Sequence, residues 1–489
     1  MRCGPEDWAG AGDARRAAPQ EAGTDDDPTI SSAAPMSGDS LSVDLLVVGG
    51  GMAGLAAASE AARRGAVVGV AEKQPEIGGS AAMSAGILWA SRSYRELRAR
   101  IPDGDPELGR AMTDDFPDAL ESVRAEGVEA SELIDGPYFG HGIGRQVDIQ
   151  GLLSRWVRDV EAAGGWVVRR TPVRRLLTAS DGRVIGARVV GPDGPIEIES
   201  AAVVLASGGI QGDPALVAAF VGPNADHVLV RSNPGSVGDG FRMAQAVGGG
   251  ASRSLSSYYG HLVSYPIRDW GERHFLPLTQ YHSIHCILVN RNGRRFIDES
   301  MGDEYNNQAI IRQPGGRAVL LADDETRQRY VVTAPYPHGE VVDRFAAAAE
   351  AGANYLAADS VHALIDGVAK WGVPESTLRM TLDSYHAAAS GASVVVDAPL
   401  PRQPAPLVVP PFHAIEVQAA LTFTYGGIRV DADTRVLDRD GRPVAGLYAA
   451  GADAGGLYHM GYGGGLSMAL VFGQRAARTA LAEHPPARR

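Results

Sequence analysis

Cysteine is scarce in this 489-residue chain, which contains only Cys3 and Cys286. Two thiols so far apart exclude a disulfide framework, a CxxC redox pair and a cysteine-ligated zinc site, and we expect no metal. So few thiols suit the reducing cytoplasm, which is the location that we expect.

Long apolar runs and an excess of positive charge are also missing. No stretch of about 18 consecutive apolar residues occurs, so no membrane-spanning helix is predicted. The 45 Lys and Arg residues are outnumbered by 58 Asp and Glu residues, which gives a net charge of −13. So acidic a chain has no general attraction for nucleic acids or anionic membranes, and we exclude both as main partners.

The first 40 residues lack apolar periodicity. Gly, Ala, Asp, Pro and Ser dominate them, so residues 1–40 are predicted to be a disordered extension. They contain no apolar segment of the kind found in secretory signals. Met36 is a second candidate for the translation start, because the first apolar strand follows it closely.

Residues 43–73 contain a dinucleotide-binding fingerprint in its full context. An apolar strand runs into a glycine turn, a small-residue helix follows, and a second strand ends on Glu72. Gly49 permits the tight turn, Gly51 lets the backbone approach a pyrophosphate at the helix N-terminus, and Gly54 lets the helix pack on the strand. Glu72 is expected to hydrogen-bond a ribose hydroxyl. The fingerprint alone is compatible with either NAD or FAD.

Glycine-terminated strands recur along the chain and are interrupted by a segment of different composition. Apolar strands predicted at 202–205 and 446–450 end in glycine, as strands that lead to a bound nucleotide do. Residues 262–420 are instead rich in His, Pro and aromatic residues, which indicates an inserted domain. We therefore expect an α/β fold in which residues 41–261 and 421–485 form a discontinuous nucleotide-binding domain.

Several motifs together resemble those of the flavoprotein family that contains fumarate reductase, 3-ketosteroid Δ1-dehydrogenase and tricarballylate dehydrogenase. They are Gly49–Gly54 with Glu72, Gly79–Gly86, Leu205–Gly209 with Gly238–Gly240, Thr424–Gly427 with Gly446–Gly451, and Asn290–Glu299. The resemblance implies a Rossmann-like FAD-binding domain of the glutathione-reductase type and an inserted α+β capping domain over the isoalloxazine. It also implies FAD as the cofactor and hydride transfer between flavin N5 and a carbon next to an activated C–C bond.

Two departures from the family pattern concern the cofactor. The Gly79–Gly86 loop contains no histidine, so FAD is expected to be noncovalent. Asp453 stands near the position of the family's ribityl-binding glutamate and is expected to replace it. By the resemblance, the expected FAD-binding residues are Gly49, Gly51, Met52, Ala53, Gly54, Glu72, Lys73, Gly79, Ser80, Ser84, Gly86, Ala206, Ser207, Gly208, Asp239, Gly451, Asp453, Leu466 and Ser467.

Other departures concern the substrate. Among the residues that bind fumarate in the family, only His261 has a counterpart. Phe423 replaces a histidine, and residues 300–307 and 460–465 contain no arginine. A small dicarboxylate needs fixed cations, so these losses argue against such a substrate.

Desaturation beside a carbonyl group needs a base for the acidic α-hydrogen, a donor for the developing enolate and a flavin for the β-hydride. Tyrosines have the first two roles in ketosteroid dehydrogenases, and the resemblance suggests Tyr462 and Tyr305 for them. His261, at the junction with the inserted segment, is the third catalytic candidate. His282 and His285 alternate with Tyr281 and Ile284 in the pattern of a strand.

These features predict an enzyme: an FAD-dependent dehydrogenase that desaturates a C–C bond beside a carbonyl in a largely apolar substrate, such as a 3-ketosteroid or a natural-product intermediate. Two alternatives stay open, an ene reductase of the fumarate reductase type acting on an unsaturated acid or ketone, and a non-catalytic FAD-binding protein. No second GxGxxG follows a strand, so NAD(P)H has no predicted site. The expected partners are a small-molecule substrate and an external electron acceptor or donor.

Overall fold

A computed structural model describes residues 41–138, 141–192, 194–334 and 339–486 of the protein. The predicted disordered extension, residues 1–40, and the candidate start at Met36 lie outside the described residues. All the described residues belong to one compact unit. Within these ranges no helix is both long and apolar enough to cross a membrane.

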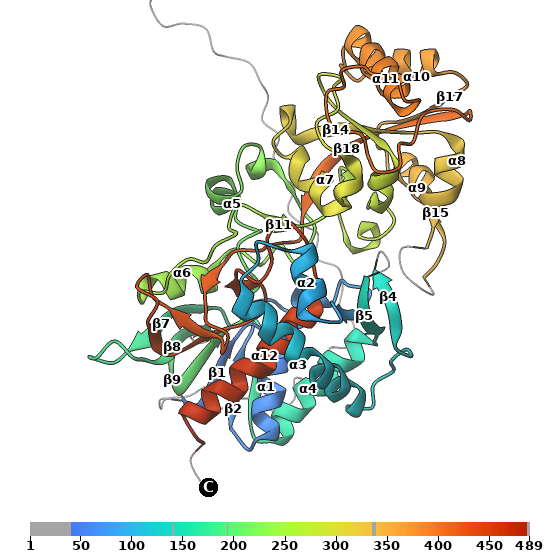
Figure 1. The fold of residues 1–489 in the computed structure, drawn as a ribbon. Coiled ribbons are helices and arrows are strands. Elements are labelled where there is room, and N and C mark those ends of the chain that lie inside the picture. Colours follow the sequence, from blue (N-terminus) through green and yellow to red (C-terminus); the bar gives the residue numbers. More distant parts are fainter. Residues whose placement is uncertain (1–40, 139–140, 193, 335–338, 487–489) are drawn as a thin grey trace, which may run out of the picture. The chain divides into compact units, whose positions relative to one another are not determined.

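The larger sheet has eight strands and contains the dinucleotide fingerprint. Its main path runs in the order β21-β22-β9-β1-β2-β6, and the hairpin of β7 and β8 joins it through β9. Figure 1 labels β7, β8, β9, β1 and β2 of this sheet. β1 (Leu41–Val48) lies at the centre, parallel to β2 (Val68–Ala71) and to β9 (Gly194–Leu205). The other strands are β6 (Trp166–Val168), β7 (Val173–Thr178), β8 (Val184–Gly191), β21 (Arg435–Leu437) and β22 (Pro443–Ala449).

Two helices rich in small residues pack together beside this sheet. α1 (Met52–Arg63) is buried along most of its length and contacts α12 (Gly465–Glu483). At Gly473 in α12 a β-carbon would lie 2.4 Å from the Ala53 carbonyl oxygen of α1. The close approach of the two helices therefore requires glycine at this position. The helices α2 (Tyr94–Arg100), α3 (Pro106–Ala125), α4 (Ile149–Ala162), α5 (Pro214–Phe220) and α6 (Asp239–Ala246) complete this part of the chain.

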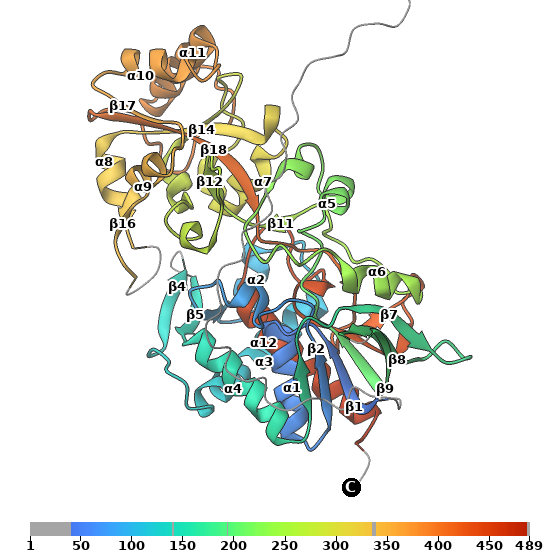
Figure 2. The same ribbon diagram turned by 180° about the vertical axis from the view of Figure 1, so that it is seen from behind.

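The second sheet has six strands and is built around one long strand, β18 (Phe412–Leu421). β18 pairs with β10 (Leu229–Val230), β12 (Leu262–Ser264), β14 (Arg317–Ala322) and β17 (Tyr355–Ala358), and β13 (Ile287–Asn290) pairs with β14. The helices α10 (Val361–Ala369) and α11 (Glu375–Ala389) lie together, with α10 beside β17 and β18, in both views (Figure 2). Further elements here are α7 (Asp303–Ile310), α8 (Asp324–Thr326) and α9 (Arg344–Glu350).

The smaller pairings complete the fold. A three-stranded sheet is formed by β3 (Ile87–Ala90), β5 (His141–Gln146) and β4 (Ile134–Tyr138). The two-stranded pairings are β11 (Tyr258–Tyr259) with β19 (Phe423–Thr424), β15 (Val332–Thr333) with β16 (Val342–Asp343), and β20 (Ile428–Arg429) with β23 (Ala454–Gly455).

The predicted α/β class and Rossmann-like nucleotide-binding arrangement are confirmed. The strand predicted at 281–285 is wrong, because this segment forms a short 3-10 helix, Tyr281–His285. Its histidines therefore do not alternate across a sheet. The domain boundaries stay a prediction; β10 precedes the predicted junction and yet pairs with β18 of the second sheet.

Candidate active site

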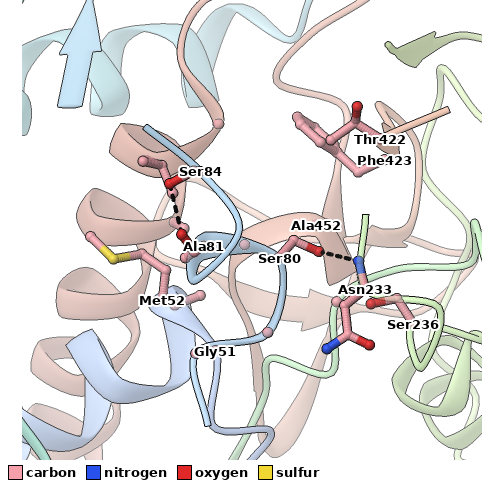
Figure 3. Close-up of a pocket in the computed structure, with 18 of the residues that line it drawn as sticks. Gly51, Met52, Ser80, Ala81, Ser84, Asn233, Ser236, Thr422, Phe423 and Ala452 are labelled. Atoms are coloured by element: carbon pink, nitrogen blue, oxygen red, sulfur yellow. Dashed lines mark hydrogen bonds between the residues drawn. The ribbon is translucent and has the colours of Figure 1, made fainter. Parts of the chain in front are cut away.

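The strands that carry the fingerprint end at one cavity. Gly51, Glu72, Ala206 and Ala450 follow β1, β2, β9 and β22, and all four line it. The carboxyl ends of parallel strands are where open α/β sheets bind their ligands. Figure 3 shows this region, with Gly51 and Met52 at the start of α1 and Phe423 and Thr422 on another wall.

The glycine turn has the geometry of a pyrophosphate site. Gly49 has a φ of +106°, and a β-carbon there would lie 2.4 Å from the Ala206 carbonyl oxygen. At Gly54 a β-carbon would lie 1.9 Å from the Gly49 carbonyl oxygen, whereas at Gly51 the nearest atom would be 3.9 Å away. Gly51 is the N-cap residue of α1 and makes no side-chain capping bond. The N–H groups of this helix end therefore face open space and suit an anionic ligand, which fits FAD.

Glu72 and Lys73 follow β2 on the same side of the cavity. The Glu72 carboxylate accepts hydrogen bonds from the Gly50 N–H at 2.6 Å and the Gln74 N–H at 2.7 Å. A carboxylate has about four acceptor sites, so two remain for a ribose hydroxyl. Lys73 forms an ion pair with Asp239, which lies at the start of α6 and does not itself line the cavity.

The Gly79–Gly86 loop forms another wall. The Ser80 hydroxyl accepts a hydrogen bond from the Asn233 N–H at 3.1 Å, and the Ser84 hydroxyl donates one to the Ala81 carbonyl at 2.7 Å (Figure 3). Gly86 has a φ of +71°, and a β-carbon there would lie 2.2 Å from the Val147 carbonyl oxygen. Gly86 therefore shapes the loop through close packing, while the two serines face the cavity.

Asp453 lies beneath the cavity wall. Its carboxylate is buried and accepts hydrogen bonds from the N–H groups of Ser207, at 2.5 Å, and Gly209, at 3.1 Å. Burial raises the pKa of this carboxyl group, and hydrogen bonds from Ser207 and Gly209 oppose that rise. Asp453 therefore holds the turn after β9, and its carboxylate is already bound to backbone. Ser467, in the first turn of α12, is likewise fully buried behind the lining residue Leu466.

The cavity thus gathers expected residues from six separate segments of the chain. The expected residues that line it are Gly51, Met52, Ala53, Glu72, Lys73, Gly79, Ser80, Ser84, Ala206, Ser207, Gly208, Gly451, Leu466 and Tyr462. The expected residues that do not line it are Gly49, Gly54, Gly86, Asp239, Asp453, Ser467, His261 and Tyr305. Within the second group, Gly49, Gly54 and Gly86 pack closely against backbone atoms. Asp239, Asp453 and His261 bond to the lining residues Lys73, Ser207 and Tyr259.

Two tyrosines lie face to face at the cavity. The rings of Tyr259 and Tyr462 are stacked, with centroids 3.6 Å apart and planes 11° apart. The Tyr462 hydroxyl accepts a hydrogen bond from the Gly465 N–H, at the N-terminus of α12, at 2.8 Å. Burial raises the pKa of Tyr462 to about 12, while hydrogen bonds with Gly465 and Tyr259 act in the opposite direction.

His261 stands behind Tyr259 and connects it to a buried carboxylate. The Tyr259 hydroxyl lies 2.7 Å from His261 Nε2, and His261 Nδ1 hydrogen-bonds Asp303. Burial lowers the pKa of His261, and Asp303 partly offsets this effect. With its Nδ1–H donated to Asp303, the imidazole accepts the Tyr259 hydroxyl proton at Nε2. His261 does not itself line the cavity, but it contacts two residues that do: Tyr259 through the hydrogen bond and Tyr281 through an edge-to-face ring contact with centroids 4.7 Å apart.

Tyr305 lies on α7, beside Gly461, the residue that precedes Tyr462. Its hydroxyl is 3.2 Å from the position of a β-carbon at Gly461, and it does not line the cavity. Burial raises its pKa, to which the neighbouring Glu304 contributes. Its surroundings are those of a packed residue beside the loop that carries Tyr462.

The sequence interpretation missed Tyr259 and Arg231. Tyr259 precedes His261 by two residues, so both side chains lie on one face of an extended segment, and that spacing was the available signal. Arg231 is 1% exposed and lines the cavity from the end of β10. An arginine directly after an apolar strand could have drawn attention to it.

The sequence matches the protein family described as an FAD binding domain over residues 44–467. The chain belongs to this family. Its flavoprotein character, FAD as the cofactor and the oxidoreductase class are thereby confirmed.

Three curated relatives of this flavoprotein act on different compounds. An NADH:fumarate oxidoreductase of Klebsiella pneumoniae is 27% identical over 90% of the chain, which spans 48% of that protein. A fumarate reductase (cytochrome) of Shewanella frigidimarina is 27% identical, and the match covers 90% of this chain and 77% of that protein. A 4-oxocyclohex-2-ene-1-carboxylate 5-dehydrogenase of Sinomonas cyclohexanicum is 26% identical, and the match covers 90% of this chain and 93% of that protein. The chain thus spans about half the length of the first of these relatives.

Two solved structures share the fold of this flavoprotein. One is an open flavocytochrome c3 fumarate reductase, with a TM-score of 0.69, 22% identity, and 91% of this chain and 79% of that chain covered. The other is the 3-ketosteroid Δ1-dehydrogenase of Sterolibacterium denitrificans in complex with 1,4-androstadiene-3,17-dione, with a TM-score of 0.73, 19% identity, and 90% and 100% covered. At these identities the likeness shows the fold.

Proposed function

We propose that this flavoprotein desaturates a carbon–carbon bond beside a carbonyl group in a largely apolar substrate. The observation that carries the proposal is the stacked pair of Tyr259 and Tyr462 at the cavity, with Tyr259 hydrogen-bonded to His261. A desaturase of this kind must remove an α-proton beside the carbonyl, and the pair provides both a base and a route for the proton.

The proton route follows the hydrogen bonds. The substrate Cα–H bond breaks, and its proton goes to the Tyr462 oxygen while Tyr462 passes its own proton to Tyr259, on whose ring it is stacked. Tyr259 passes its proton to His261 Nε2, and the imidazolium that forms is stabilised by Asp303. The β-hydrogen leaves as hydride, so the substrate loses one proton and one hydride and gains a C=C bond. The Gly465 N–H, at the positive end of α12, stabilises negative charge on Tyr462 during transfer.

The cofactor residues follow from the same cavity. The α1 N-terminus at Met52 and Ala53 would hold the pyrophosphate of FAD, Glu72 the ribose, and the Gly79–Gly86 loop a wall beside the ring system. Bound FAD would supply the hydride acceptor. The absence of histidine from this loop supports noncovalent binding.

The cavity favours an apolar substrate body. Phe275, Leu276 and Phe423 line it together with the stacked tyrosines. The name of the Sinomonas relative supports a carbonyl-directed desaturation, since it describes dehydrogenation of a cyclic substrate with an oxo group and a carboxylate.

The second candidate is an ene reductase that runs the reaction in reverse. It is favoured by the names of the Klebsiella and Shewanella relatives, which are fumarate reductases. The same proton route would then deliver a proton to the substrate α-carbon. The electron donor or acceptor would be an external partner, because no second GxGxxG follows a strand.

Anaerobic mixing of the purified holoenzyme with substrates distinguishes these activities. Bleaching of the flavin by a cyclic ketone such as androst-4-ene-3,17-dione is the expected result for the desaturase. Reoxidation of dye-reduced flavin by an unsaturated acid or ketone, without bleaching by saturated compounds, would favour the reductase. No response to either class would favour a non-catalytic FAD-binding protein. A preparation that neither contains nor takes up FAD would contradict all three.

A further inference from the structure

We infer that Arg231 binds a single anionic group of the substrate, so that the substrate is a monocarboxylate or similar monoanion with an apolar body. The inference rests on the proposed function, because it concerns the substrate of the same cavity. Three of the residues that line this cavity are of the acidic or basic types Asp, Glu, Lys and Arg: Glu72, Lys73 and Arg231. Lys73 is paired with Asp239, and Glu72 is on the FAD-binding side.

The Arg231 guanidinium is buried among neutral groups. Its Nε donates to the Thr279 hydroxyl at 3.0 Å, and its Nη2 donates to the Phe275 carbonyl and the Tyr281 hydroxyl, both at 3.0 Å. Its Nη1 has only a long contact, 3.4 Å, with the Thr422 hydroxyl. The guanidinium also lies over the Phe275 ring, 3.6 Å from its centroid. Within the described ranges, no carboxylate forms an ion pair with it.

This arrangement leaves both a charge and donor capacity unused. A guanidinium has five N–H donors, and Nη1 supplies two of them. Four neutral contacts orient the group without neutralising it, whereas burying a cation without an anion is unfavourable in general. An anion that enters the cavity would remove that cost and accept the Nη1–H bonds.

The position of Arg231 favours the substrate over FAD. Its backbone N–H donates to the Leu421 carbonyl at 2.8 Å, where β10 pairs with the end of β18. Its side-chain partners come from residues 275–281 and from Thr422. The pyrophosphate site has its own donors at the start of α1. Arg231 also lowers the pKa values of His261 and Tyr462, so it is close to the proton route.

One cation selects one anionic group. A dicarboxylate would leave its second carboxylate beside Phe275, Leu276 and Phe423, without a cation. The cavity therefore favours a carboxylate at one end of a compound and an apolar, carbonyl-bearing remainder near the tyrosine pair.

Paired acids and amides test this inference without turnover. The holoenzyme is titrated at pH 7.5 with benzoate and benzamide, cyclohexanecarboxylate and its carboxamide, and trans-cinnamate and cinnamamide, and binding is followed by the perturbation of flavin absorbance. At least one acid is expected to bind about tenfold or more tightly than its amide, because hydrogen bonds to charged groups exceed neutral ones. Replacement Arg231→Gln is expected to abolish this preference with little change for the amide, and Arg231→Lys to keep part of it.

Arg317→Gln is the matched control. Arg317 pairs with Glu416 and does not line the cavity, so this variant should keep the wild-type preference. Acids that bind no more tightly than their amides in the wild type would overturn the inference, even if Arg231→Gln failed to fold. An unchanged preference for acids over amides in Arg231→Gln would also overturn the inference. A loss of FAD affinity as the only effect of this replacement would overturn it as well. Flavin reduction by a neutral ketone without acid preference would contradict the inference alone, and acid preference without any redox reaction would contradict the proposed function alone.

Discussion

The ring of Tyr259 lies flat against the ring of Tyr462, with centroids 3.6 Å and planes 11° apart. The two residues come from distant parts of the chain, one just before His261 and the other just before α12. Tyr462 meets the helix N-terminus through Gly465, and Tyr259 meets a buried imidazole. The stacked pair therefore connects the positive N-terminal end of α12 to the His261 imidazole, which can accept a proton.

Replacement of Tyr462 by Phe is expected to slow flavin reduction by about 10²- to 10⁴-fold, the usual contribution of one general base. FAD should remain bound, because the ring and its stacking are kept. Anaerobic stopped-flow absorbance measures the rate, with Tyr94→Phe as the control, since Tyr94 packs against Arg110 and does not line the cavity. An unchanged rate would remove Tyr462 from the mechanism.

Tyr259→Phe and His261→Gln are expected to have overlapping effects. Both interrupt one hydrogen-bonded route, so the double variant should lose little more rate than the worse single variant. The same stopped-flow measurement gives a double-mutant cycle. Fully additive losses would mean that the two side chains act independently.

The replacements Gly51→Ala and Gly54→Ala are expected to affect different properties, the first FAD affinity and the second the stability of the fold. A β-carbon at Gly51 has no neighbour closer than 3.9 Å, so the apoprotein should keep its stability while FAD binding weakens by about tenfold or more. A β-carbon at Gly54 would lie 1.9 Å from the Gly49 carbonyl oxygen, and such overpacking typically costs about 1–3 kcal/mol. Thermal unfolding of the apoproteins and fluorescence titration with FAD measure the two effects. Equal losses of FAD affinity at unchanged stability would contradict the distinction.

Buried histidines should make the protein sensitive to acid. Burial, with Arg344 and His285 contributing, lowers the pKa of His282 well below 6.5, so the unfolded state binds more protons than the folded state. Stability is then fully present above about pH 6.5 and falls below it, by about 1.4 kcal/mol per pH unit for one such group.

Replacement His282→Leu tests this directly. Both ring nitrogens of His282 lack a hydrogen-bond partner in the described structure, so the variant should lose little stability at pH 8. Its melting temperature should fall less than that of the wild type between pH 7 and pH 5.5. The exposed His227, with 83% of its side chain accessible, is the control, and His227→Leu should behave as the wild type does. An identical acid response of the His282 variant would refute the assignment.

Much of the nucleotide-binding half followed from sequence. The glycine turn, the acid at Glu72 and the small-residue helix are local features, and each depends on neighbours within about 30 residues. The serines of the Gly79–Gly86 loop were found because small residues so close together indicate backbone contact with a ligand. The strand expected at 281–285 failed because apolar alternation over five residues is too short to exclude a tight helix.

The surroundings of Asp453 and His261 could not be predicted, because they are formed by contacts between distant segments of the chain. Asp453 was expected to face the cofactor, but its carboxylate is bound by the backbone of Ser207 and Gly209 more than 200 residues away. His261 was identified by its position in the chain, whereas its contacts with the lining residues Tyr259 and Tyr281 and its hydrogen bond to Asp303 were not foreseen.

The sequence by itself determined the α/β class and the dinucleotide site, because these rest on backbone conformations that glycine and small residues specify locally. FAD as the occupant of that site followed from the resemblance of the combined motifs to a flavoprotein family. The tertiary structure decided which side chains meet. It stacked Tyr259 on Tyr462 and left the buried Arg231 beside the cavity without a carboxylate partner among the described residues. The physical reason is that charge compensation and ring packing depend on distances between segments, which no local pattern encodes.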